Sequence, residues 1–123
     1  MTLSVVHIVF DCADAEKLAS FWAAALRRDV DPEANAFFAT VGRPDPGQVT
    51  LMFLQVPEGK QGKNRMHLDL AGDDWETELV RLTELGAVRV GEFHEYGMRW
   101  FTLRDPEGNE FDLGAGTDAP AQA

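Results

Sequence analysis

Two stretches of the chain alternate apolar and polar residues in the same way. Residues 65–70 place Met66 and two leucines on one face of a strand, and His67 lies on the other face, because strand side chains have a period of two. Residues 6–11 repeat the layout around His7. An aspartate suited to cap a helix follows each stretch, and both the histidines (7 and 67) and the aspartates (14 and 74) are 60 residues apart. The pattern predicts one structural unit written twice.

Apolar residues at three- and four-residue spacing follow each aspartate, which predicts two helices. The first should run from Asp14 to about Arg27, and the second from Asp73 or Asp74 to the glycine at 86, a residue typical of helix ends. Alternation and turn residues predict the strands: 3–12, a short edge strand near 30, 36–42, 49–56, 65–70, 87–95, 98–104 and 110–113.

Each half therefore reads as a strand, a helix and about three further strands. We expect a single α+β domain over residues 1–123, with a first module at about 1–57, a second at about 64–114 and a loose tail at 115–123. The helices should cover one face of each sheet. The opposite faces should be concave, and both histidines point to them by parity.

The composition excludes several classes of partner. The net charge of −10 argues against nucleic acids and anionic membrane surfaces. A single cysteine, Cys12, fits a reducing compartment, and neither a long apolar run nor a basic leader segment stands out. These features predict a cytoplasmic protein with no membrane or nucleic-acid partner.

The candidate chemistry lies on the predicted concave faces. His7 and His67 occupy equivalent places, and Asp112 lies on the final strand with inward parity. Two imidazoles and a carboxylate form a familiar set for a divalent ion such as Zn, Fe, Mn or Ni, among which the residues do not discriminate. The other reading is that they are hydrogen-bonded packing residues. The third histidine, His94, has no equivalent in the first half and is expected at the surface.

Other residues complete the predicted site. Glu110 and Asp69 are candidate general bases if either lies within about 3 Å of the proton it removes. The candidates for ligand contact from the concave faces, or else for ordinary packing, are Phe38, Met52, Leu54 and Trp100.

The order of several short motifs resembles the vicinal oxygen chelate superfamily, and most closely its glyoxalase-like branch. The motifs span nearly the whole chain: His7-Ile8-Val9-Phe10 before a helix, Val56-Pro57-Glu58, Lys63-Asn64-Arg65-Met66-His67-Leu68-Asp69-Leu70, Leu85-Gly86-Ala87 and Asp105-Pro106-Glu107-Gly108-Asn109-Glu110-Phe111. The resemblance implies paired βαβββ modules in a cup-shaped, barrel-like sheet with the helices outside, usually as a homodimer. Carried over by position, it implies metal ligands at His7, His67 and Asp112, and a fourth near Leu54.

Two departures from the family pattern narrow the function. Leu54 cannot bind a metal, and Asp112 stands where the family usually has glutamate. A four-ligand glyoxalase I is therefore not expected. Two functions stay open: a metal-dependent lyase, isomerase, transferase or dioxygenase acting on a small molecule, and a metal-free protein that binds a drug or natural product. A third reading is a domain for dimerisation or regulation.

Overall fold

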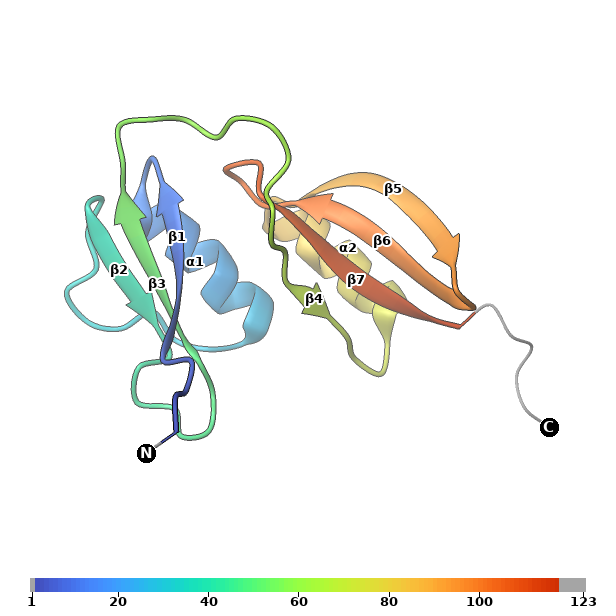
Figure 1. Cartoon of the computed structure of the whole chain (residues 1–123), viewed down its shortest axis with the longest axis horizontal. Coiled ribbons are helices and arrows are strands. Elements are labelled where there is room, and N and C mark those ends of the chain that lie inside the picture. Colours follow the sequence, from blue (N-terminus) through green and yellow to red (C-terminus); the bar gives the residue numbers. More distant parts are fainter. Residues whose placement is uncertain (1, 118–123) are drawn as a thin grey trace. The chain divides into compact units, whose positions relative to one another are not determined.

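The computed structural model describes residues 2–117, which fall into two compact units divided between Lys60 and Gln61. Each unit contains one helix packed against one sheet of mixed strand direction (Figure 1). The predicted α+β class and the duplication of a helix-and-sheet module are confirmed.

The first unit is a three-stranded sheet with order β1-β3-β2. Strand β1 is parallel to β3, and β2 is antiparallel to it. An isolated bridge between Val30 and Val41 stands where a short edge strand was predicted. The elements are β1 (His7–Cys12), α1 (Ala15–Leu26), β2 (Phe38–Val41) and β3 (Thr50–Gln55).

The second unit repeats this plan with a fuller sheet of order β4-β7-β6-β5. Its first strand is again parallel to its last, and the other pairs are antiparallel. The elements are β4 (Asp69–Leu70), α2 (Trp75–Leu85), β5 (Val88–Glu95), β6 (Met98–Arg104) and β7 (Glu110–Thr117).

Both helices begin at the predicted aspartates. The carboxylate of Asp14 accepts a hydrogen bond from the N–H of Lys17 at 3.1 Å, and that of Asp74 accepts one from Thr77 at 3.2 Å. These bonds satisfy N–H groups that have no partner inside a helix. At the far end of α2, Gly86 has φ 121°, a conformation that favours glycine.

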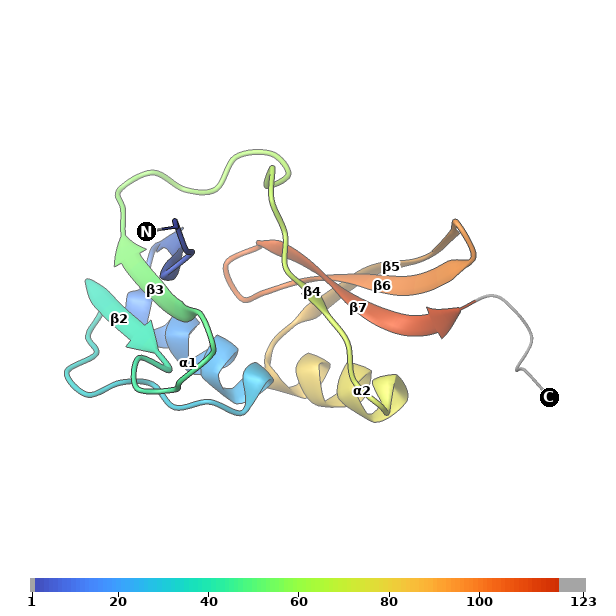
Figure 2. The same ribbon diagram turned by 60° about the horizontal axis from the view of Figure 1, so that its bottom comes forward.

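In each unit the core lies between the helix and one face of the sheet. Phe53 of β3 is fully buried and stacks on Phe10, which also contacts the buried Trp22 of α1. In the second unit Leu82 of α2 and Phe111 of β7 are buried to 2% and 1% exposure. Figure 2 shows α2 along one side of its sheet. The other side of each sheet is not covered by the helix of its own unit.

Three predicted boundaries are corrected by the strand pairing. The first strand begins at His7 rather than residue 3, because its partner begins at Thr50, just after a proline-rich turn. The strand predicted over 65–70 keeps only its last two residues. Before them, the side chain of Asn64, and not the backbone of a strand, hydrogen-bonds to the backbone of Glu110. The predicted tail is wrong at 115–117, which continue β7. The remainder of that tail lies outside the described residues.

Within residues 2–117, neither helix has the length and apolar character needed to cross a lipid bilayer.

Candidate metal centre

Strand pairing in the second unit places two carboxylates next to each other. Asp69 of β4 lies directly opposite Asp112 of β7. The neighbours of Asp112 along the strand, Phe111 and Leu113, are buried against the helix side. Because successive strand residues point to opposite faces, both aspartates project from the face that α2 leaves uncovered.

His67 completes a cluster with these two aspartates. Its Nδ1 atom lies 2.7 Å from Oδ1 of Asp69 and 3.7 Å from Oδ2 of Asp112. One ligand atom from each of the three side chains lies within 4.8 Å of the others. The side chains are 39%, 72% and 19% exposed in the order His67, Asp69 and Asp112, so the cluster is open to solvent.

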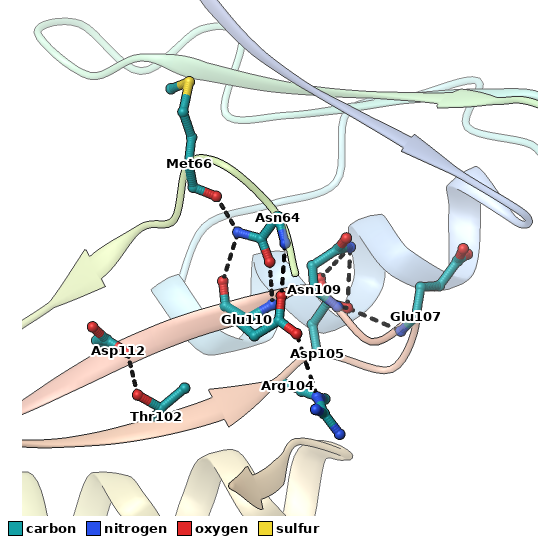
Figure 3. Close-up of polar contacts among 9 residues, drawn as sticks. All are labelled: Asn64, Met66, Thr102, Arg104, Asp105, Glu107, Asn109, Glu110 and Asp112. Carbon is teal, nitrogen blue, oxygen red and sulfur yellow. Dashed lines mark hydrogen bonds and ion pairs between the residues drawn. The ribbon is translucent and has the colours of Figure 1, made fainter. Parts of the chain in front are cut away.

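The carboxylate of Asp112 is held in place by a threonine on the next strand. Thr102 of β6 is the direct partner of Asp112, and its hydroxyl donates to Oδ1 at 2.7 Å (Figure 3). The other oxygen, Oδ2, is the one that faces His67. This bond orients the second oxygen toward the cluster.

Glu110, a predicted general base, is held by two donors. Its Oε1 accepts the backbone N–H of Asn64 at 3.1 Å, and its Oε2 lies 3.4 Å from Nε of Arg104. The Glu110 side chain is only 10% exposed. A carboxylate held by two donors and shielded from solvent is well suited to hold the chain in position.

The side-chain amide of Asn64 imitates a strand. Its Oδ1 accepts the N–H of Glu110 at 2.8 Å, and its Nδ2 donates to the carbonyl of Glu110 at 3.3 Å and to the carbonyl of Met66 (Figure 3). The amide thereby anchors the segment that carries His67 to β7. We name this set of bonds between Asn64 and Glu110 the Asn64 clamp.

A tight turn fixes the start of β7 beside the clamp. The carboxylate of Asp105, 2% exposed, accepts N–H bonds from Glu107 and Asn109 at 2.9 and 3.0 Å (Figure 3). Gly108 in the same turn has φ 88°, which glycine adopts without strain. The turn motif therefore determines where β7, and with it Asp112, begins.

The remaining predicted residues of the first unit share the face opposite α1. His7 is exposed and pairs with Thr50, while Phe38 and Leu54 are direct partners. Met52 and Leu54 are half-buried. These side chains belong to the first unit, and the cluster with His67 lies in the second.

Strand register also identifies the counterpart of Asp112 in the first unit. Met52 pairs with Val9 of β1 as Asp112 pairs with Asp69 of β4, and both pairs are related by the 60-residue repeat. The fourth family ligand was expected near Leu54, but by register its position is that of Met52. Neither side chain suits a metal such as Zn or Mn that takes nitrogen and oxygen ligands.

Trp100 also lies on the open face of its sheet, and sequence reasoning missed its neighbour there. Phe93 of β5 is the direct partner of Trp100, and the two rings stack with centroids 5.8 Å apart. The sequence signal was Gly91, because a glycine inside a strand often marks a bulge that changes which residues face outward.

The donor set of the cluster fits a divalent ion. One imidazole nitrogen and two carboxylate oxygens suit Zn, Mn, Fe or Ni, and two ligands of one ion lie no more than about 4.4 Å apart. His67 already lies within that distance of both aspartates. The Asp69 side chain is mostly exposed, so solvent-filled space is available for it to turn toward Asp112. Three ligands would leave coordination positions open.

A comparison with protein-family models gives a match to the glyoxalase-like domain over residues 7–114. The chain belongs to the glyoxalase-like domain family. The comparison with curated proteins found no match.

Solved structures share the fold of this glyoxalase-like protein at low sequence identity. A glyoxalase/bleomycin resistance protein/dioxygenase family enzyme from Burkholderia phytofirmans is 16% identical, with TM-score 0.73, over 91% of this chain and 98% of the other. A variant of the fosfomycin resistance protein FosX from Listeria monocytogenes, in complex with Mn(II) and a dihydroxypropylphosphonic acid, is 16% identical, with TM-score 0.73, over 95% and 93%. A bleomycin-binding protein from Streptomyces verticillus, in complex with copper(II)-bleomycin, is 19% identical, with TM-score 0.61, over 94% and 98%.

Proposed function

We propose that this glyoxalase-like protein binds a divalent metal ion through His67, Asp69 and Asp112 and uses it to bind vicinal oxygen atoms of a small molecule. The observation that carries the proposal is the convergence of three ligand atoms on the open face of one sheet. The complex of a structural neighbour with Mn(II) and a diol supports it.

The residues of the chain have separate roles in this proposal. Asp112 supplies a ligand oxygen whose direction Thr102 sets through its hydrogen bond. Asp69, predicted as a general base, is reassigned as a ligand because register places it opposite Asp112. Glu110, also predicted as a base, is reassigned to positioning, because its two carboxylate oxygens contact Asn64 and an arginine. When bound, the ion would act as a Lewis acid on a substrate oxygen.

His7 is kept as a further proposed ligand. It is an exposed histidine at the place in the first unit that His67 holds in the second. The resemblance of the sequence to the family supports this assignment. A His7→Ala variant should therefore lower metal affinity.

A metal-free binding protein is the second candidate. It is favoured by the apolar face opposite α1, where Phe38 is 38% exposed beside the half-buried Met52 and Leu54. The structural similarity to a bleomycin-binding protein also supports it. In that case the apolar face would hold a flat drug or natural product.

Metal binding separates the two candidates. Metal analysis of protein purified without chelator, followed by titration with Mn(II), Zn(II) and Ni(II), should show a stoichiometric site. The substitutions His67→Ala and Asp112→Asn should each weaken it at least tenfold. His94→Ala is a matched control, because His94 is an exposed histidine that lies 3.1 Å from a carboxylate, that of Glu92. A wild-type protein that takes up no metal, or a loss as large in the His94 variant, would refute the metal site.

The cellular compartment and the oligomeric state are also part of the proposal. We expect a cytoplasmic homodimer with a small-molecule ligand, since a lone cysteine fits a reducing compartment and the family resemblance implies a dimer. Light scattering of the purified chain tests the dimer.

A further inference from the structure

An aromatic pair lies on the same open face as the cluster of His67, Asp69 and Asp112. Phe93 of β5 and Trp100 of β6 are direct cross-strand partners, and their rings stack at an interplanar angle of 21°. Phe93 is 41% exposed and Trp100 is half-buried. Part of this apolar surface is therefore accessible to a ligand.

The rings on the opposite face of the same sheet are in a different situation. The guanidinium of Arg89 lies 4.4 Å from the centroid of Phe101, and that of Arg99 lies 4.7 Å from the centroid of Trp75. Those cationic groups cover rings that belong to the packing against α2. The pair on the open face belongs to a different layer, which α2 does not cover.

Strand register places the pair two residues along the strand from the row that contains Asp112. Trp100 lies two residues before Thr102 on β6, so both face the same side, and Thr102 pairs with Asp112. Trp100 is thus the diagonal neighbour of Asp112, at about 7–8 Å, a separation that aromatic side chains bridge.

Two glycines lie beside the aromatic pair on the open face. Gly91 is the partner of Thr102, and a Cβ atom added there would lie 3.4 Å from the ring of Phe93. The Phe93 ring therefore leans over Gly91 toward the row of Thr102 and Asp112. Gly114 is the partner of Trp100 and has no side chain to fill the space beside the indole.

We propose that Phe93 and Trp100 form a platform for a planar aromatic group of the ligand whose oxygen atoms meet the metal at His67, Asp69 and Asp112. The proposal rests on the proposed metal site and adds the class of ligand: an aromatic compound that carries two adjacent oxygen donors. The spacing suits a small ring directly attached to the donor group. The platform would select for the ring, and the ion would select for the oxygen atoms.

The test compares two probes with the same oxygen donors. Benzohydroxamate carries a phenyl ring where acetohydroxamate carries a methyl group, and both offer two adjacent oxygens. With metal-loaded full-length protein, calorimetry should show benzohydroxamate binding about tenfold more tightly. Quenching of tryptophan fluorescence should accompany benzohydroxamate binding and should be absent with acetohydroxamate.

Substitutions locate the effect on the platform. Phe93→Leu and Trp100→Leu should each weaken benzohydroxamate binding by roughly two- to tenfold, the range for one aromatic contact, and leave acetohydroxamate binding within about twofold. Phe93→Tyr and Trp100→Phe keep a ring and should keep the preference. Phe37→Leu is the matched control, because Phe37 is 70% exposed and belongs to the first unit.

The possible outcomes separate the two proposals. Failure of the wild-type protein to load metal would refute the proposed function. Metal loading with equal affinity for the two probes would leave that function standing and refute the platform. Equal losses for both probes in the Phe93→Leu and Trp100→Leu variants would also refute it, because a general disturbance of the sheet would then explain them.

Discussion

Replacing Thr102 with valine exchanges one hydroxyl for a methyl group of similar size, so it tests directly how Asp112 is positioned. The Thr102 hydroxyl donates to Oδ1 of Asp112 at 2.7 Å, and Oδ2 faces His67. Without this bond, the carboxylate samples other rotamers and presents its free oxygen to the cluster for less of the time.

The magnitude follows from the chemistry and exposure of the bond. Hydrogen bonds to charged groups contribute about 1.5–3 kcal/mol, and loss of a group that supports a metal ligand typically lowers metal affinity by about 10- to 100-fold. The Asp112 side chain is 19% exposed, so water replaces part of the lost donor. We therefore expect a loss near the lower limit, about tenfold, or about 1.4 kcal/mol.

The assay is a competition titration with Mn(II) or Zn(II) on wild-type protein and Thr102→Val. Thr83→Val is the matched control, because the Thr83 hydroxyl donates to the carbonyl of Leu79 on the exposed surface of α2. Metal affinity should be unchanged in that variant. An affinity within about twofold of wild type for Thr102→Val would refute the positioning role of Thr102.

Three further predictions concern stability. Gly42→Ala should lower the free energy of unfolding, measured in urea, by about 3 kcal/mol. Gly42 has φ 75°, and the added Cβ would lie 2.0 Å from the guanidinium of Arg28. Gly47→Ala is the control, because Gly47 has φ 77° and open space around it, so it should show only the smaller backbone cost. Phe53→Ala should cost about 3–5 kcal/mol in the same assay, because the ring is fully buried, and a cost below about 1 kcal/mol would contradict this packing. The hydrogen bond from Arg99 lowers the pKa of the Glu92 carboxyl in the folded chain. The ionised carboxylate therefore stabilises the fold at pH values above the unfolded pKa, and this contribution is lost as the pH falls through the folded pKa. Glu92→Gln should therefore show a smaller fall in Tm between neutral and acidic pH, and an unchanged fall would contradict the ion pair.

Local signals in the sequence were enough to predict the modules. A capping aspartate, the apolar spacing of a helix and a glycine at its end act within a few residues. The N-cap of α1 is Asp14, as predicted, and the N-cap of α2 is Asp74, one of the two aspartates predicted for it. The period of two also placed His67 and Asp112 on one face, as the contact between them confirms.

Long-range pairing decided what the sequence did not predict. The length of β4 depends on the bonds between Asn64 and Glu110, which are 46 residues apart. The position of Asp69 opposite Asp112, on which its proposed role as a ligand depends, follows from the register between two distant strands. Phe93 was not among the predicted contacts. The register shift between Arg89 and Gly91 changes which residues of β5 share a face, and simple alternation does not predict such a shift.

The Asn64 clamp makes the segment carrying His67 sensitive to chemical ageing of one residue. Deamidation would replace the Nδ2 donor of Asn64 with a carboxylate oxygen facing the carbonyl of Glu110, and would add a negative charge near the Glu110 carboxylate. A carboxylate oxygen would then face the carbonyl oxygens of Glu110 and Met66, to which Nδ2 now donates. Because β4 has only two residues, loss of the amide bonds would weaken the attachment to β7 of the segment that carries His67, and the buried residues of both cores would be unaffected.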